Sequence, residues 1–246
     1  MKEQWERTAR LIGWDGIEWL RQAKVAVFGL GGVGGSCAEA LARSGIGELW
    51  IVDRDVVSPS NLNRQIIATT DTVGRKKTEV MAERLRAVAP ECHVKTFDLF
   101  FLPPEDPVLT AALDYVVDAV DTVTAKLFLA EECQRLGLPL ISSMGTGNRM
   151  DPSQLQVTDL FLTKGCPLAK VMRRECKKRG IHHLPVVFST EAPIPNAFVP
   201  EQEGHSPGSS PFVPAAAGLL LASAVVKNLL EVKNHGRKRN CNGTKG

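Results

Sequence analysis

Short apolar runs recur along the chain up to Gly147, and polar or glycine-containing segments separate them. Residues 24–28, 48–53, 115–118 and 138–143 form such runs and predict buried strands, and residues 93–97 alternate in polarity like a further strand. Helical periodicity predicts helices in residues 3–22, 76–88 and 125–136, and a further helix follows the glycines after residue 28 and runs through about residue 43. This alternation predicts an α/β fold, Rossmann-like, with a mostly parallel sheet flanked by helices.

After Gly147 the pattern changes. Residues 155–161 and 186–190 predict two further strands and residues 167–179 a helix, which together indicate a C-terminal extension of the same sheet. Residues 193–211 contain five prolines and predict a long surface loop. The apolar run 212–226 has 15 residues, fewer than the roughly 20 of a membrane span, so it predicts a buried C-terminal helix and no transmembrane span.

The positive net charge of the chain comes from its C-terminal end. Its 246 residues have a net charge of +3, but five Lys and Arg residues and no acidic residue follow Val232, which leaves a body of −2 (3 − 5). We therefore expect a single domain over residues 1–232 and a disordered basic tail over residues 233–246. The six cysteines form no CxxC pair and no signal peptide is evident, so we expect free thiols, no zinc and a cytoplasmic protein.

A glycine-rich segment between the first strand and the next helix points to a nucleotide. Glycines allow a tight turn and close backbone approach, and the helix N-terminus favours a phosphate. Asp53 lies 19 residues beyond Gly34, at the end of the second strand, where a carboxylate accepts hydrogen bonds from ribose hydroxyls. The motif does not decide between NAD and ATP. Its glycines are Gly29, Gly31, Gly32 and Gly34.

Three further features favour ATP. Arg64 lies in a polar segment after the second strand, and its guanidinium suits phosphate oxygens. Basic residues at 75–77 begin a helix, where cations are unfavourable unless an anion meets them. Asp121 follows the fourth strand at the edge where ligands bind, and a carboxylate there suits Mg²⁺. Each feature has a structural alternative: an ordinary polar loop for the Arg64 segment, a solvated helix start for residues 75–77, and a helix N-cap for Asp121.

In this order, GLGGVGG, DRD, NLNRQ, GRKK and DAVDT resemble the ubiquitin-activating-type (ThiF/MoeB/HesA-like) adenylation domain. The resemblance implies that Asp53 binds ribose, that Arg64 and Lys77 hold the triphosphate, and that Asp121 positions Mg²⁺. It also implies a homodimer, in which Arg10 reaches the partner subunit's site. The implied catalytic residues are Arg64, Lys77 and Asp121. The implied ATP-binding residues are Gly29, Gly31, Gly32, Gly34, Asp53, Asp55, Asn61 and Arg10.

Further segments resemble the tRNA threonylcarbamoyladenosine dehydratases, among them residues 8–13, 38–47, 79–84, 151–158, 187–191 and 210–218. This resemblance implies that ATP adenylates the threonyl carboxylate of the modified nucleoside in tRNA. The neighbouring carbamoyl group, already tethered, then displaces AMP.

Several alternatives remain at this point. The chain could activate the C-terminal glycine of a ubiquitin-like sulfur carrier and bind a sulfur-transfer partner, although the lack of CxxC pairs favours the dehydratase. An NAD-dependent oxidoreductase and a nucleotide-bound scaffold are further hypotheses. Cys166 and Cys176 are either reactive thiols beside a basic helix or small core residues. The basic helix is also a candidate surface for tRNA phosphates. The residues that would bind them are Lys170, Arg173, Arg174, Lys177 and Lys178.

Overall fold

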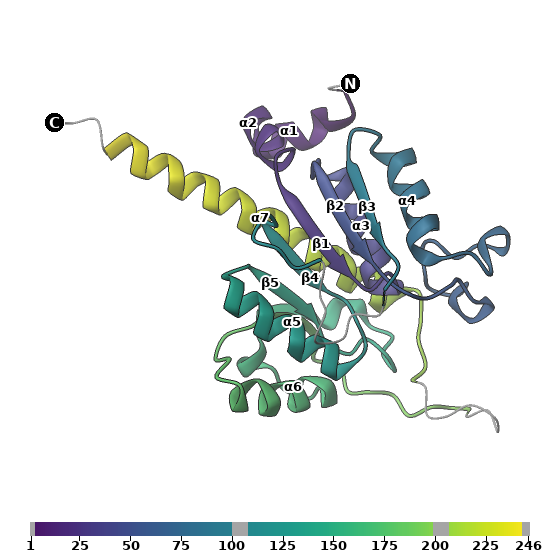
Figure 1. The fold of residues 1–246 in the computed structure, drawn as a ribbon. Coiled ribbons are helices and arrows are strands. Elements are labelled where there is room, and N and C mark those ends of the chain that lie inside the picture. Colours follow the sequence, from purple (N-terminus) through teal and green to yellow (C-terminus); the bar gives the residue numbers. More distant parts are fainter. Residues whose placement is uncertain (1–2, 100–107, 199–206, 243–246) are drawn as a thin grey trace.

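The computed structural model describes residues 3–99, 108–198 and 207–242, with side chains to residue 233. Seven strands form one sheet in the order β3-β2-β1-β4-β5-β7-β6, and only β6 and β7 pair antiparallel (Figure 1). This confirms the predicted α/β fold and its C-terminal sheet extension. The strands are β1 Lys24–Phe28, β2 Glu48–Val52, β3 His93–Phe97, β4 Tyr115–Asp118, β5 Leu140–Ser143, β6 Leu155–Asp159 and β7 Pro185–Ser189.

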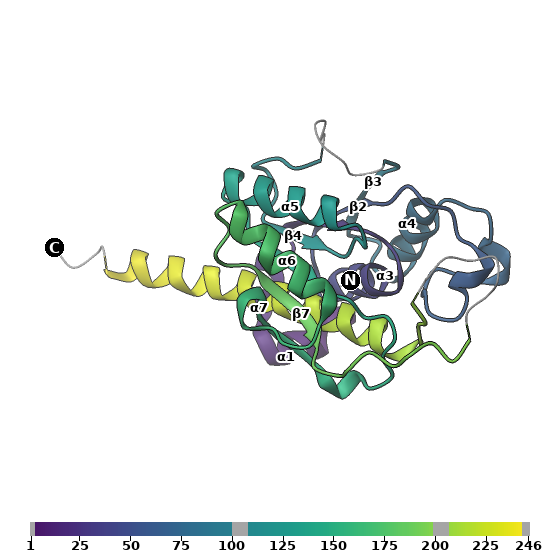
Figure 2. The ribbon, with the colours of Figure 1, turned by 90° about the horizontal axis from the view of Figure 1, so that it is seen from below.

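Helices cover both faces of the sheet because successive strand residues point to opposite sides. On β1, Val25 and Val27 pack with α3 (Gly32–Arg43), α4 (Lys77–Val88) and α7 (Phe212–Asn242). Ala26 and Phe28 pack on the other side with α5 (Val123–Leu136) and α6 (Pro167–Lys178). Figure 2 shows α5 on one side of the sheet and α7 with α1 on the other. The result is a three-layer sandwich whose central strand is buried on both faces.

The predicted C-terminal helix is confirmed as a core element. Val213, Ala217, Leu221 and Val225, four residues apart, are fully buried or nearly so, and α7 packs against α3. A Cβ on Gly218 would lie 2.3 Å from the carbonyl oxygen of Val33, so this glycine lets the two helices approach closely. Phe212–Lys233 is long and apolar enough to cross a membrane by length and composition, and 44% of its most apolar window is buried.

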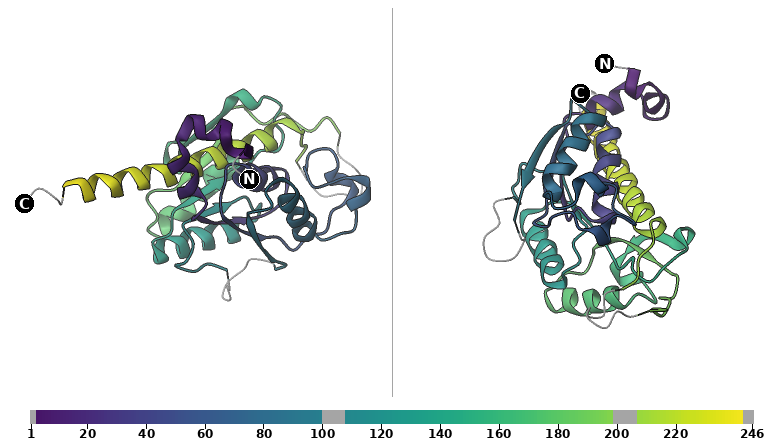
Figure 3. Two further views of the ribbon diagram at one scale, coloured as in Figure 1. Left: turned by 90° about the horizontal axis from the view of Figure 1, so that it is seen from above. Right: turned by 90° about the vertical axis from the view of Figure 1, so that its right-hand side faces the viewer.

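The structure describes part of the basic tail as helix, and the expected disorder of this tail stays a prediction. The structure continues α7 to Asn242, past the predicted start of disorder at Lys233, and residues 243–246 lie outside the described part. Figure 3 shows this end of the helix extending away from the rest of the chain.

Two element predictions were wrong. The expected single helix over residues 3–22 is a 3-10 turn, Glu3–Trp5, followed by α1 (Glu6–Ile12) and α2 (Trp14–Leu20). Gly13 adopts a φ of 75° between them, which ends α1 and turns the chain. The strand expected to reach residue 161 ends at Asp159, because its carboxylate accepts a hydrogen bond from the Phe161 N–H and starts a 3-10 turn.

Candidate active site

A cleft of about 780 Å³ lies at the carboxyl ends of the parallel strands. It sits at the point where the strand order reverses between β1 and β4, which is where open α/β sheets bind ligands. The cleft brings together nine of the residues predicted for the ATP site. They are Gly29, Gly31, Gly32, Asp53, Asp55, Asn61, Arg64, Lys77 and Asp121.

The glycine turn is shaped for close approach. Gly29 has a φ of 87°, and a Cβ on it would lie 2.6 Å from the carbonyl oxygen of Ala119. A Cβ on Gly34 would lie 1.7 Å from the Gly29 carbonyl oxygen, so Gly34 holds α3 against the turn and does not line the cleft. The first residues of α3 therefore present their N–H groups to the cleft, as a phosphate site requires.

Asp53 fixes this turn from the neighbouring strand. Its carboxylate accepts hydrogen bonds from the N–H of Leu30 at 2.7 Å and of Asp55 at 2.8 Å. A carboxylate has further lone pairs, so these bonds leave capacity for ribose hydroxyls. Asn61, predicted to touch ATP, uses its side-chain oxygen to accept the Ser58 N–H at 3.1 Å and so shapes the turn before Arg64.

Of the basic residues predicted to hold the triphosphate, Arg64 and Lys77 line the cleft. Lys77 is 6% exposed, lines the cleft and pairs with Asp55 at 2.8 Å. Arg64 lines the cleft and donates to the Ser60 carbonyl oxygen, and within the described residues no carboxylate pairs with it. The other two basic residues at the start of α4 point elsewhere: Arg75 pairs with Glu83, and Lys76 pairs with Asp98.

Asp121 lies just beyond β4, exposed, on the wall of the cleft. The N-cap residue of α5 is Thr122, without a side-chain capping bond, so the proposed cap role of Asp121 is not what the structure shows. Its carboxylate accepts a hydrogen bond from the Thr122 hydroxyl at 3.2 Å. The described residues hold no cluster of three or more metal-ligating side chains.

A buried ion pair that sequence reasoning missed supports this edge of the cleft. Lys126 of α5 and Asp118 of β4 are each 1% exposed, and the ammonium lies 3.1 Å from both carboxylate oxygens. Lys126 also donates to the Ser143 carbonyl oxygen at 2.7 Å. One side chain thus ties α5 to the ends of β4 and β5, from which Asp121 and the 144–147 segment continue.

The opposite wall was also missed. Residues 145–147 and 207–209 line the cleft, although residues 193–211 were predicted as a surface loop, of which 199–206 lie outside the described residues. The Asn148 N–H donates to the Gly208 carbonyl oxygen at 2.7 Å, and the Asn63 amide donates to the Ser209 carbonyl oxygen at 3.0 Å. Nothing local in the sequence indicates these contacts, because their partners are about 60 and 146 residues apart along the chain.

Arg10 lies outside this cleft. It is on α1, exposed, and pairs with Glu6 at 2.6 Å. Its predicted role requires a second subunit, so it stays a prediction.

The basic helix α6 begins beside the cleft, where Leu168 lines the wall. Lys170, Arg174, Lys177 and Lys178 are exposed. Arg173 differs from the prediction, because its guanidinium turns inward and donates to the Thr163 carbonyl oxygen at 2.9 Å. Hydrogen bonds from Lys178, Arg174 and Arg179 hold the pKa of Glu175 down at about 2, so one fixed negative charge lies among the basic residues.

The two candidate thiols are buried. Cys166 is 2% exposed and Cys176 fully buried, and burial raises the pKa of the Cys176 thiol to about 11. The core interpretation of Cys176 is therefore the better one.

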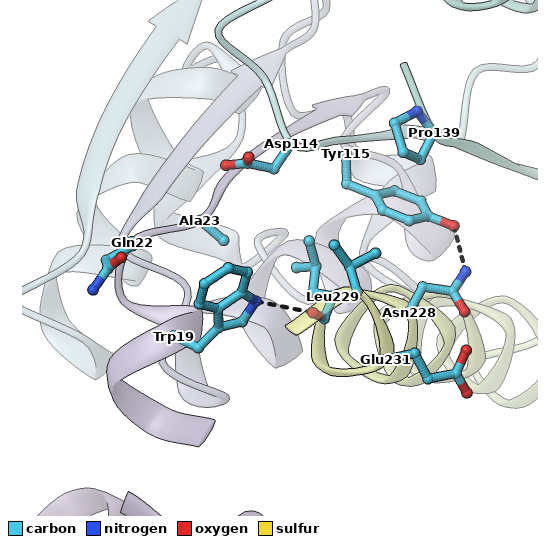
Figure 4. A pocket seen from close by; sticks show the side chains of 10 residues that line it. Trp19, Gln22, Ala23, Asp114, Tyr115, Pro139, Asn228, Leu229 and Glu231 are labelled. Atoms are coloured by element: carbon cyan, nitrogen blue, oxygen red, sulfur yellow. Dashed lines mark hydrogen bonds between the residues drawn. The ribbon is translucent and has the colours of Figure 1, made fainter. Parts of the chain in front are cut away.

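A second cavity, of about 890 Å³, lies at the amino ends of the strands, and residues 228–232 of α7 form one of its walls (Figure 4). Its walls include Trp19, whose indole N–H donates to the Leu229 carbonyl oxygen, and Tyr115, whose hydroxyl accepts from the Asn228 amide. Figure 4 shows no basic side chain among the lining residues it labels. This cavity thus lacks the groups that hold a phosphate.

The glycine turn, its carboxylate and the facing cations define a nucleotide-binding α/β protein. The ThiF family model matches residues 5–246, and the chain belongs to this family. It is 40% identical over 244 residues to the tRNA threonylcarbamoyladenosine dehydratase of Bacillus subtilis strain 168, covering 94% of this chain and 96% of that protein. Over 200 residues it is 42% identical to the dehydratase of Escherichia coli K12, covering 78% and 75%.

Among solved structures, the chain is similar to the E. coli dehydratase TcdA in complex with ATP. The TM-score is 0.85 at 36% identity, over 95% of this chain and 96% of that one. The similarity spans both the nucleotide half and the C-terminal sheet extension, as the sequence motifs predict.

Proposed function

We propose that this chain is an ATP-dependent enzyme that dehydrates threonylcarbamoyladenosine in tRNA. One observation supports this most: a single cleft sets Arg64, Lys77 and Asp121 against a glycine turn, as adenylation of a carboxylate requires. The relatives that match the chain over nearly its whole length are dehydratases of this nucleoside. The relative TcdA has been solved with ATP and with AMP, the nucleotides at the two ends of such a reaction.

The reaction has two steps. The threonyl carboxylate attacks the α-phosphate of ATP, and pyrophosphate leaves. Arg64 and Lys77 stabilise the charge that develops on the phosphates, with Lys77 exchanging its Asp55 partner for the nucleotide. The tethered carbamoyl group then attacks the acyl carbon and AMP leaves, so the net change is loss of one water.

Mg²⁺ fits this cleft through the nucleotide. The ion keeps several waters and binds through one or two carboxylates plus substrate phosphates. Asp121 offers an exposed carboxylate on the same wall, so it would hold the ion, which when bound neutralises phosphate charge.

The tRNA would lie along α6. Lys170, Arg174, Lys177 and Lys178 are exposed on a helix whose first turn borders the cleft, so backbone phosphates could bind there while the modified base enters. Glu175 lowers the net charge of this surface without removing it.

We also propose a cytoplasmic homodimer. Five cysteines of the described chain are free, which suits a reducing compartment. Arg10 and Leu11 are exposed on α1, and Leu11 is 86% exposed, so this helix can reach a neighbouring subunit. Sedimentation analysis tests the dimer, and mixing Arg10→Ala with Asp121→Ala chains tests whether activity returns in the mixture.

The second candidate function is activation of a ubiquitin-like carrier, with a sulfur-transfer partner, since the superfamily includes such enzymes. Exchange of labelled pyrophosphate into ATP separates the two. We expect exchange that depends on tRNA carrying threonylcarbamoyladenosine. Exchange that depends on a carrier protein with a C-terminal glycine, and not on tRNA, would contradict the proposal.

A further inference from the structure

The cleft has two chemically different halves. One half carries the ionisable residues Asp53, Arg54, Asp55, Arg64, Lys77 and Asp121. The other half is formed by Gly145, Thr146, Gly147, Pro207, Gly208 and Ser209, which have no ionisable side chain. The charged half matches a triphosphate with its cation, and the neutral half suits an uncharged group that forms hydrogen bonds.

Contacts within the chain fix the shape of the neutral half. The Gly208 and Ser209 carbonyl oxygens are held by the Asn148 N–H and the Asn63 amide. A Cβ on Gly147 would lie 2.8 Å from the Cβ of Pro207, so the two segments of this wall touch. A wall that is fixed by such contacts loses little conformational entropy when a substrate binds.

Gln65 provides the second, independent observation. It is 7% exposed and lines the cleft, and its amide nitrogen lies 3.8 Å from the position of a Cβ on Gly31. Its backbone N–H donates to the Asn61 carbonyl oxygen at 2.9 Å, so the residue is fixed where the glycine turn faces Arg64. The amide oxygen is buried and has no hydrogen-bond partner among the described residues.

A buried acceptor without a donor is unfavourable and calls for an explanation. The triphosphate of ATP cannot supply it, because phosphate oxygens at neutral pH only accept hydrogen bonds. The ribose hydroxyls of ATP can donate, but Asp53 is the acceptor expected for them. A carbamoyl group can, since it offers N–H donors and a carbonyl acceptor, the complement of an amide. A rotation of the Gln65 side chain would bring its amide to such a ligand.

We propose that the neutral half of the cleft binds the uncharged carbamoyl part of the threonylcarbamoyl group, with the threonyl carboxylate directed at the charged half. The Gln65 amide is the hydrogen-bond partner of this carbamoyl moiety. This inference rests on the proposed function and adds how the enzyme distinguishes a modified from an unmodified tRNA. Gln65 would thus determine specificity for a urea-type acyl group, while Arg64 beside it holds phosphate.

The test compares the Kd of a tRNA carrying threonylcarbamoyladenosine with that of the same tRNA without the modification. Wild-type chain should bind the modified tRNA more tightly. Gln65→Met should reduce that preference about three- to tenfold, the value of one hydrogen bond. Binding of unmodified tRNA, and of ATP–Mg²⁺ by calorimetry, should change less than about twofold on the same scale.

Gln156→Met, at an exposed position on the edge strand β6, is the matched control and should leave the preference unchanged. If Gln65→Met melts at a lower temperature, Gln65→Glu keeps the length of the side chain, removes its donor and should lose the preference as well. An unchanged preference in both variants would overturn the inference, as would a parallel loss of ATP affinity, which would assign the amide to the nucleotide. A wild type with no preference and no product would instead refute the proposed function itself.

Discussion

The two cavities at opposite ends of the sheet differ in chemistry more than in size. The cleft at the carboxyl ends is the smaller, at about 780 Å³ against about 890 Å³ for the cavity at the amino ends. The first holds a glycine turn, three basic residues and three carboxylates. The second is walled by Trp19, Tyr115 and Leu229, and its lining includes two carboxylates and no basic residue (Figure 4). Volume does not identify the active site here. Backbone N–H groups and facing charges at the strand ends do.

The physical reason is the direction of parallel strands. Their carboxyl ends all meet at one edge, and each is followed by a loop that leads into a helix, so helix N-termini and loop side chains collect there. At the amino ends of the strands lie the C-termini of helices and residues 228–232 of α7. These segments pack there by burying apolar surface. Substitutions at the two ends should therefore affect different properties.

The largest difference is expected for a pair of aspartates. Asp121→Ala at the carboxyl end should lower kcat by about a thousandfold, because it removes the carboxylate proposed to position Mg²⁺. Asp114→Ala in the amino-end cavity removes an acceptor for the Lys24 N–H and should leave turnover within about twofold, since it touches no reacting group. Steady-state turnover of modified tRNA measures both. Equal losses of turnover in the two variants would contradict the proposed difference between the two ends of the sheet.

The buried ion pair beneath the cleft should have the next largest effect. Lys126→Met leaves the Asp118 carboxylate buried without its cation and should lower the free energy of unfolding by about 3–5 kcal/mol. Lys126→Met combined with Asp118→Leu removes both charges and should recover most of that loss. Urea denaturation of the three proteins provides the measurement. A single variant as stable as wild type would mean that the pair does not support the strand ends.

The surface next to the cleft should respond to salt. Changing Lys170, Arg174 and Lys177 of α6 to Glu should weaken tRNA binding and lower the slope of log K against log salt by about 2 to 3, or about 0.7 to 0.9 for each lost contact. Arg173 is kept, because it bonds to Thr163. Filter binding at several salt concentrations checks this, with ATP affinity as the control. An unchanged slope would assign tRNA to another surface, such as the basic end of α7.

A smaller effect is expected in the amino-end cavity. Tyr115→Phe removes the hydrogen bond with the Asn228 amide and should cost about 1 kcal/mol of stability. Turnover should not change, because this cavity lies at the far edge of the sheet. Thermal melting and the turnover assay together decide it. A clear loss of turnover at unchanged stability would give this cavity a role in the reaction.

The smallest effect is expected for the thiols. Burial raises the pKa of Cys176 to about 11, so the thiol is protonated at pH 8 and becomes a thiolate only well above that pH. Cys176→Ser and Cys166→Ser should therefore retain turnover within about twofold where they fold. Loss of turnover in a variant with normal melting would point to a covalent relay and to the carrier-protein alternative.

The sequence predicted one half of the cleft well and the other half poorly. The glycine turn, Asp53 and Asp121 follow strands and Lys77 begins a helix, so local pattern placed them in the cleft. Arg64 lies in a loop and was placed by the NLNRQ segment, which resembles the adenylation family. Gln65 and the 207–209 wall were not recognised as parts of a substrate site. Their positions depend on contacts such as that between Asn63 and Ser209, which are far apart in the chain.

The same limit explains the smaller errors. Apolar periodicity alone could not place the turn at Gly13, which depends on a positive φ. The direction of the Arg173 side chain depends on Thr163, ten residues earlier, and a helical projection does not contain that information. The ion pair of Lys126 with Asp118 was missed because charged residues are expected at the surface.

Mass spectrometry of tRNA nucleosides tests the central claim most directly. A tRNA carrying threonylcarbamoyladenosine is incubated with ATP and Mg²⁺, with the wild-type chain or with Asp121→Ala, and then digested to nucleosides. The account predicts that the wild type converts the modified nucleoside into a product lighter by one water, with release of AMP and pyrophosphate, and that the variant does not. A modified nucleoside that stays unchanged with folded, ATP-binding wild-type chain would contradict it.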